Sequence, residues 1–274
     1  MNIKPEILRL EETGSTNTVC MQKGRSGADA WTVVVAERQT NGRGRLDRQW
    51  QSAAGKSLLF SVLLRPEIPL AHVGLIPLAV ATAMEEALRD TCGADVMIKW
   101  PNDLVLKGKK VCGILMECVL EQQKAASALP ESLAEAGKTA TTNPGEQYPA
   151  FVVAGLGLNV YRGSCPEELS ETATCLEEAC TALPGREEIL RSFLTAFAER
   201  IELLEQGATD RILEEYTRKC ATIGSRVQVS GSRSFRGTAR SLRQDGSLVV
   251  EDENGGMNIV YSGDVSVRGV MGYV

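Results

Sequence analysis

Residues 96–120 read VMIKWPNDLVLKGKKVCGILMECVL, and this stretch predicts consecutive strands of one β-sheet. Its apolar runs read as three strands, at 96–100, 104–106 and 111–120. Pro101 separates the first two runs, because proline has no N–H to give to a strand ladder. The KGKK sequence at 107–110 is typical of a tight hairpin turn, in which Gly108 supplies the permissive backbone. The last two strands are therefore expected to form a hairpin.

Sequence on both sides of this stretch adds further elements. Apolar and β-branched runs predict three more strands, at 32–37 (TVVVAE), 57–64 (SLLFSVLL) and 150–160 (AFVVAGLGLNV). Residues 75–91 are rich in alanine and have apolar positions at helical spacing, so they predict a helix that ends at Gly93. Amphipathic helices are also expected at 187–204 and 210–220. A chain of 274 residues with 43% hydrophobic content is long enough to bury one sizeable core and to add a smaller domain.

The pattern changes from Arg226 onward, where short β runs alternate with glycine turns. The runs RVQVS, FRGTARSL, SLVVED, MNIVYSG and DVSVRGV predict a small all-β barrel of about 50 residues. A boundary near 223–225 gives domains at 1–223 and 224–274. Residues 121–149 are poor in large apolar side chains and rich in Ala, Thr, Glu and Pro, so we expect a flexible hairpin insertion there.

Composition restricts the compartment and the kind of ligand. A net charge of −5 argues against a broad nucleic-acid surface, so a local basic loop points to a small anion. The eight cysteines include no CxxC pair, and we expect reduced core residues rather than zinc ligands. No run has the length of a signal peptide or a membrane span, which favours a cytoplasmic protein with no membrane partner.

The sequence GRGRLDRQW at 42–50 places cations on a glycine-rich backbone. Arg43 and Arg45 carry planar guanidinium groups that suit phosphate and carboxylate oxygens. The flanking glycines allow close approach to a ligand and a change of loop shape. Trp50 can stack on a base or an apolar ligand, or it can anchor the core. From these residues alone, the stretch is either an anion-binding loop or a solvated turn.

A second polar group follows at 99–110. A strand break places Asn102 and Asp103 at a turn. Asp103 can ligate Mg²⁺ or accept a hydrogen bond from an attacking amine. Lys110 can stabilise charge that develops on a phosphate or carbonyl oxygen. Taken alone, the group can equally be a capped turn with solvated lysines.

The motifs are more specific in combination. GRGR-x4-W, KWPND-x6-KVCGIL and GLGLN, with Ser15-Thr16-Asn17 ahead of them, resemble the biotin protein ligase family (biotin–[acetyl-CoA-carboxylase] ligase) in order and spacing. The resemblance covers residues 10–160 strongly and the C-terminal part more weakly. It implies an α+β fold: a mixed β-sheet flanked by helices, of the class II synthetase-like biotin/lipoate ligase kind, with a small SH3-like C-terminal barrel.

The resemblance also implies a two-step reaction. Biotin and ATP, with Mg²⁺ accompanying the ATP, give biotinyl-5′-AMP and pyrophosphate. The adenylate then acylates one lysine of the biotin carboxyl carrier domain of a biotin-dependent carboxylase. No bound structural metal is expected. The implied catalytic residues are Arg45, Lys110 and Asp103, of which Asp103 orients or deprotonates the incoming lysine, with a magnesium role as the competing interpretation.

Ligand contacts follow from the same resemblance. The implied biotin-binding residues are Ser15, Thr16, Gln39, Gly42, Arg43, Arg45, Lys110, Gly113 and Gly157. The implied nucleotide-binding residues are Arg45, Trp50, Asn102, Lys110 and Asn159. Within the first set, the resemblance places Ser15, Thr16 and Gln39 at the ureido ring. It places Arg43 and Arg45 around the biotin carboxylate and the adenylate phosphate, in a loop that closes over the water-sensitive mixed anhydride.

Some features depart from the family or leave alternatives. Asp47 stands where many relatives have glycine, and the sequence leaves its effect open. A lipoate or octanoate ligase shares the fold, although GRGR and KWPND favour biotin. A catalytically inactive binding module is the alternative from another class, and the retained charged residues argue against it. The single histidine, His72, and the absence of a GxSxG elbow argue against a serine hydrolase.

Two expectations concern partners. The segment before Ser15 is short, so we expect neither the helix-turn-helix DNA-binding domain that some relatives carry nor a repressor role on DNA. The sequence is equally compatible with a monomer and a homodimer.

Overall fold

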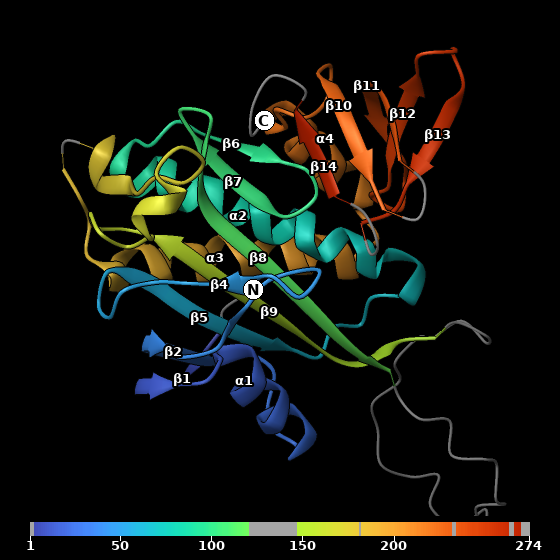
Figure 1. Ribbon diagram of the computed structural model, residues 1–274. Coiled ribbons are helices and arrows are strands. Elements are labelled where there is room, and N and C mark those ends of the chain that lie inside the picture. The colour runs from blue at the N-terminus through green and yellow to red at the C-terminus, as the bar shows by residue number, and fades with distance from the viewer. Residues whose placement is uncertain (1–2, 121–146, 181, 232–233, 263–265, 270–274) are drawn as a thin grey trace, which may run out of the picture.

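The strands predicted at 96–120 form one side of a seven-stranded sheet (Figure 1). The computed structural model describes residues 3–120, 147–180, 182–231, 234–262 and 266–269. Across the sheet the strands are β1 (Glu6–Thr13), β2 (Thr32–Gln39), β5 (Ser57–Leu64), β9 (Pro149–Asn159), β8 (Lys109–Leu120), β7 (Asp103–Leu106) and β6 (Val96–Lys99). β1 and β2 are parallel, and the other neighbouring pairs are antiparallel, which confirms the expected mixed sheet. Most of the insertion expected at 121–149 lies outside the described residues.

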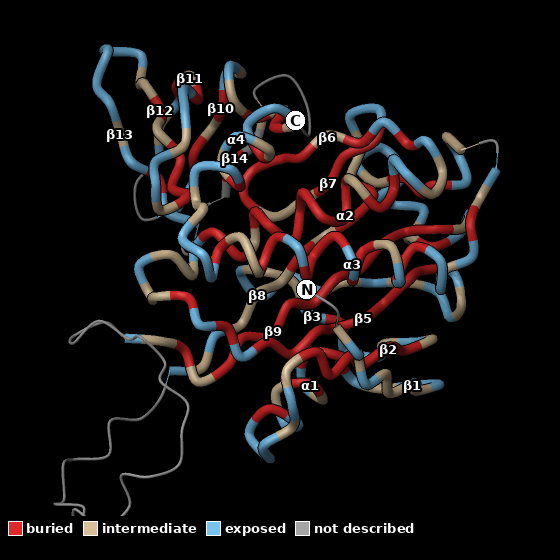
Figure 2. Tube along the Cα trace, turned by 180° about the vertical axis from the view of Figure 1, so that it is seen from behind, coloured by how far each residue is buried: buried red, intermediate tan, exposed pale blue. Residues whose placement is uncertain are grey.

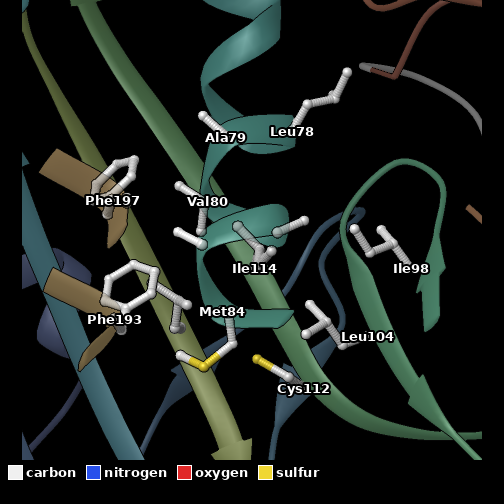
Figure 3. Packing of buried hydrophobic residues seen from close by; sticks show 14 of the residues in the cluster. Leu78, Ala79, Val80, Met84, Ile98, Leu104, Cys112, Ile114, Phe193 and Phe197 are labelled. Carbon is white, nitrogen blue, oxygen red and sulfur yellow. The ribbon is translucent and has the colours of Figure 1, made fainter. Parts of the chain in front are cut away.

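Helices cover both faces of the sheet. All eight residues of β5 are buried, because this strand lies between β2 and β9 and is covered above and below. α2 (Ile76–Cys92) and α3 (Arg186–Glu205) lie on one face, and α1 (Thr16–Arg25) lies on the other, so the buried segments of Figure 2 gather at the centre. On the α2 face, Met84 lies between Phe193 and Cys112 in the view of Figure 3.

α2 is the helix predicted at 75–91. It ends where the N–H of Gly93, at a φ of 63°, donates to the carbonyl oxygen of Arg89 at 2.9 Å. Residues Leu70–Cys92 are long and apolar enough to cross a membrane, yet 61% of the apolar window is buried inside the protein. This burial is typical of the core helix of a folded domain.

The C-terminal part forms a separate antiparallel sheet. In spatial order its strands are β13 (Met257–Val260), β12 (Leu248–Asp252), β11 (Phe235–Leu242), β10 (Arg226–Ser230) and β14 (Ser266–Gly269). α4 (Thr209–Lys219) leads into it and contacts β11. The indole N–H of Trp100 donates to the carbonyl oxygen of Gly246 at 3.1 Å, which joins the two parts. The small all-β unit is confirmed, and its boundary near 223–225 stays a prediction.

Three local expectations need correction. The stretch GRGRLDRQW is a hairpin rather than a plain loop, since β3 (Gly42–Arg43) pairs antiparallel with β4 (Gln49–Trp50). Asp103 is the first residue of β7, paired with Lys99, and lies just after the turn. Cys118 is an exposed thiol rather than a core residue, because β8 becomes exposed toward its end.

Candidate functional site

A pocket of about 160 Å³ opens on the α1 side of the large sheet. Its walls come from the start of α1, the β3–β4 hairpin, residues 99–103 and the middle of β8 and β9. Every predicted site residue lines this pocket except Gly42 and Asn159. Segments far apart in the sequence therefore meet at the place where the motifs indicated a single site.

One end of the pocket is a buried network of neutral polar side chains. Gln39 accepts hydrogen bonds from the N–H of Thr16 at 2.7 Å and from its hydroxyl at 3.1 Å. The Ser61 hydroxyl lies 2.6 Å from the amide oxygen of Asn17 and 2.8 Å from the Thr16 hydroxyl. Ser15 precedes the helix in an extended conformation, and all these side chains except Gln39 are buried. The start of α1 is thus fixed to β2 and β5.

The floor of the pocket is made of glycines. A methyl group at Gly157 would overlap the indole of Trp50, and one at Gly155 would overlap the amide of Asn17. Gly113 pairs with Gly157 across β8 and β9, and a Cβ at Gly113 would lie 2.9 Å from Cζ3 of Trp50. The indole therefore lies directly on the strand backbone. Among the described residues, its buried Nε1 has no hydrogen-bond partner.

Charged groups form the other end of the pocket. The Lys110 Nζ lies 2.6 Å from Oδ1 of Asp103 and 5.5 Å from the centre of the Trp50 ring. The backbone of Lys110 is also held, since its N–H donates to the carbonyl oxygen of Thr172 at 2.8 Å and its carbonyl oxygen accepts from Thr174 at 2.9 Å. These contacts give the ammonium group a definite position beside the glycine floor.

The two arginines of the hairpin have different partners. Arg43 forms a bidentate ion pair with Glu117 of β8, with N–O distances of 2.9 and 3.2 Å. Arg45 donates to the side-chain oxygen of Asn102 at 2.9 Å and to the carbonyl oxygen of Ser262 in the C-terminal domain. Arg43 thus holds the base of the hairpin on the sheet, and Arg45 links its tip to both domains.

The tip of the hairpin has an unusual backbone. Leu46 and Asp47 have φ angles of 53° and 56°, in the left-handed region that favours glycine. The Gly44 N–H donates to the carbonyl oxygen of Arg48 at 2.7 Å, which closes the turn. Aspartate enters this region more readily than most residues do, so Asp47 is compatible with a turn that glycine would also adopt.

Cys112 is a buried thiol on the same strand as Lys110. Burial raises its pKa to about 12, and the charges of Lys110 and Asp103 act on it in opposite directions. The thiol is therefore protonated near neutral pH, which makes it a poor nucleophile.

The two predicted residues outside the lining have other roles in the fold. A methyl group at Gly42 would overlap the carbonyl oxygen of Trp50, so glycine at this position allows β3 and β4 to pair closely. Asn159 is buried and donates to the carbonyl oxygen of Thr174 at 3.0 Å. A contact of either residue with a ligand stays a prediction.

Sequence reasoning overlooked several residues of this region, among them Glu117 and Val267. Glu117 could have been noticed, because strand alternation puts it on the same face as Gly113. Val267 of β14 also lines the pocket, although it comes from the other domain. No local pattern marks Val267, since only the packing of the two domains brings it there.

Comparisons with known proteins agree with the motifs. Residues 10–128 match the model of the "Biotin/lipoate A/B protein ligase family". Residues 222–268 match the model of the "Biotin protein ligase C terminal domain". The chain is 33% identical over 261 residues to the biotin–[acetyl-CoA-carboxylase] ligase of Mycobacterium tuberculosis, covering 93% of this chain and 86% of the relative. It is 30% identical over 258 residues to the bifunctional ligase/repressor BirA of Bacillus subtilis, covering 92% and 71%.

A solved structure shares the fold over almost its whole length. The biotin protein ligase from Aquifex aeolicus in complex with biotin and ATP aligns with a TM-score of 0.76 and 27% sequence identity. The alignment covers 96% of this chain and 99% of that one. The expected α+β architecture and the resemblance stated from the motifs are both confirmed.

Proposed function

Because the chain belongs to the biotin/lipoate A/B protein ligase family and is an enzyme of the biotin–[acetyl-CoA-carboxylase] ligase type, we propose that it works through a biotinyl-5′-AMP intermediate. Biotin and ATP give the adenylate and pyrophosphate, and the adenylate acylates a lysine of a biotin carboxyl carrier domain. The observation that carries this proposal is the pocket itself, where a neutral polar end and a cationic end share one glycine floor.

The neutral end suits the ring system of biotin. Ser15, Thr16 and Gln39 supply hydroxyl, amide and backbone groups that can exchange hydrogen bonds with a ureido group. We assign them this role, with Gly42 and Arg43 at the base of the hairpin as the adjoining wall. Buried donors and acceptors select strongly for a ligand that satisfies them, since one that does not leaves them unpaired.

The cationic end suits the first chemical step. One oxygen of the biotin carboxylate attacks the α-phosphorus of ATP, a P–O bond forms, and the bond to the pyrophosphate leaving group breaks. Both reacting groups are anionic, so Lys110 and Arg45 are assigned to the oxygens on which charge is concentrated. Gly113 and Gly157, on which the Trp50 indole lies in this structure, are assigned to biotin. Trp50, Asn102 and Asn159 are assigned to the nucleotide side.

Magnesium is treated as part of the ATP co-substrate. The described residues contain no group of three or more His, Cys, Asp or Glu side chains arranged to hold a metal ion. Asp103, the acidic residue that competes for this role, already pairs with Lys110 at 2.6 Å. We therefore assign Mg²⁺ to the phosphates of ATP, and no step is assigned to an ion held by the protein.

The second step transfers the acyl group. The amine of the carrier lysine attacks the carbonyl carbon of the mixed anhydride, a C–N bond forms, and AMP leaves with the electrons of the C–O bond. Asp103 is assigned to orient this amine or take its proton, because its carboxylate lines the pocket 2.6 Å from the Lys110 ammonium group.

Closure of the β3–β4 hairpin is the proposed means of keeping water from the adenylate. Arg43, Arg45 and Arg48 are natural trypsin sites within it. Biotin together with ATP should slow cleavage between residues 42 and 48, whereas cleavage at equal rates with and without the substrates would show that the hairpin does not close.

The proposal extends to the partner of the enzyme and to its compartment. The partner is the carrier domain of a biotin-dependent carboxylase, and the compartment is the cytoplasm. The absence of an operator-binding role stays a prediction, which a DNA-binding measurement on the full chain can test. The proposal is equally compatible with a monomer and with a homodimer.

The central test is direct detection of the intermediate. The protein is incubated with ATP, Mg²⁺ and either biotin, lipoic acid or octanoic acid, and the acyl-adenylate is measured by mass spectrometry. We expect biotinyl-5′-AMP only, followed by biotinylation when a carrier domain is added. Absence of this adenylate, under conditions in which a known biotin ligase forms it, would refute the proposal, and a lipoyl or octanoyl adenylate would favour the related ligases.

A further inference from the structure

Glu117 lies at the base of the hairpin and carries no role in the reaction proposed above. Both of its carboxylate oxygens engage the guanidinium of Arg43, at 2.9 and 3.2 Å. The Glu117 side chain is 20% exposed and that of Arg43 is 45% exposed. The bidentate geometry fixes the direction of the arginine as well as its distance.

The same carboxylate is also bonded to α1. Its Oε2 accepts from the side-chain N–H of Asn17 at 2.9 Å. The amide oxygen of Asn17 is held in turn by the hydroxyl of Ser61, next to Thr16. One acidic side chain therefore joins the hairpin to the buried polar network at the neutral end of the pocket.

Glu117 acts through its neighbours rather than on a ligand. Gly113 and Leu115 line the pocket from the same face of β8, whereas Glu117 lies beyond the lining residues. Each strand of the hairpin is only two residues long, and a ribbon this short has little stability of its own. A contact that anchors its base can therefore decide where the wall of the pocket stands.

We propose that Glu117 is a positioning residue that holds the base of the hairpin, through Arg43, against the Asn17 network. The neutral end of the pocket is then complete before biotin arrives. The guanidinium of Arg43 serves mainly to keep this wall in place, and Arg45 at the tip remains the arginine that meets the reacting anions. This inference rests on the proposed function, because its main readout is the use of biotin.

The test is Glu117→Gln, which keeps the size of the side chain and an acceptor for Asn17 but removes the charge that holds Arg43. We expect the KM for biotin to rise about tenfold, with kcat within about twofold, because Lys110 and Asp103 are untouched. Trypsin should cut the hairpin faster in this variant when no ligand is present. The matched control is Glu12→Gln, which breaks the Glu12–Arg38 ion pair of 2.7 Å on β1 and β2 and should change neither readout.

A double-mutant cycle separates anchoring from ligand binding. If Arg43 acts through Glu117, the double variant Arg43→Gln with Glu117→Gln should have a KM for biotin within about twofold of that of Glu117→Gln alone, because both changes break the same ion pair. A KM raised by the product of the two single effects, or a Glu117→Gln variant that behaves like Glu12→Gln, would overturn the inference while the unmodified enzyme still forms biotinyl-5′-AMP. An unmodified protein that forms no adenylate would refute the proposed function first, and this inference with it.

Discussion

The neutral end and the cationic end of the pocket are built by different means. Thr16, Asn17 and Ser61 are buried, and Ser61 of β5 is bonded to both of the other two at the start of α1. The side chains of Lys110 and Asp103 are 26% and 14% exposed, and the long side chain of Lys110 carries its charge into the pocket. The neutral end is thus part of the core, whereas the cationic end is a surface that the fold has brought together.

Substitutions at the two ends of the pocket should therefore have different effects. Short side chains in a bonded network fix a shape, so a change there should disturb folding and ligand fit together. Long cationic side chains place charge where the reaction needs it, so a change there should disturb the chemistry and leave the fold nearly intact.

Lys110→Ala should have the largest effect. Removing a preorganised cation from the developing oxyanion should lower kcat for adenylate formation by about 10²–10³-fold, measured as pyrophosphate release. The thermal midpoint should change little. Lys109→Ala is the matched control, because its ammonium group donates to the carbonyl oxygen of Ser170 outside the pocket. Equal losses in the two variants would mean that the position of the charge is unimportant.

Gly155→Ala should lower the stability of the fold, which Lys110→Ala should leave nearly unchanged. The added methyl group would overlap the amide of Asn17, and overpacking of this kind costs about 2 kcal/mol of unfolding free energy. We expect a thermal midpoint lower by about 5 °C, measured by calorimetry, together with weaker binding of biotin. Gly14→Ala is the control, since nothing lies within 4 Å of its Cβ position. An unchanged midpoint in Gly155→Ala would show that the neutral end is less rigid than the comparison requires.

Strong local patterns made most of the fold predictable. The strand at 57–64 and the helix at 75–91 have dense apolar runs, and the structure places them at 57–64 and 76–92. The KGKK turn was also clear, because Lys107 and Gly108 both have a positive φ, as a tight hairpin turn requires. Where burial on both faces or a turn fixes the residue type, the sequence carries the signal directly.

Weakly amphipathic elements escaped prediction. β1 is an edge strand with no fully buried residue, and its sequence EILRLEET contains several charged residues. α1 has few large apolar residues, since much of its buried surface is polar side chain in the site network. The STN motif marked the position of the site, but a motif does not report that its residues begin a helix.

The sequence indicated which residues line the pocket better than it indicated which of them contact one another. Lys110 and Asp103 were both selected, yet only the structure shows that they form an ion pair. Trp50 was expected at the nucleotide, and the structure also lays it on Gly113 and Gly157. Pairings of this kind depend on strand register and side-chain direction, which no single local pattern encodes.

Substitutions of Asp47 should have the smallest effect. Two variants separate the backbone conformation at this position from the charge of its side chain. Asp47→Gly relieves the left-handed φ of 56° but makes the unfolded chain more flexible, so the two effects should nearly cancel and move the thermal midpoint by no more than about 1 °C. Asp47→Asn keeps the backbone preference and removes the charge. Both variants remove one negative charge beside Arg45 and Arg48, so both should retain biotinyl-5′-AMP about twofold longer, measured as its dissociation half-life. A change in Asp47→Gly alone would mean that the conformation of the tip governs closure. In that case the hairpin would resemble the neutral end of the pocket, where shape decides, more than the cationic end, where charge decides.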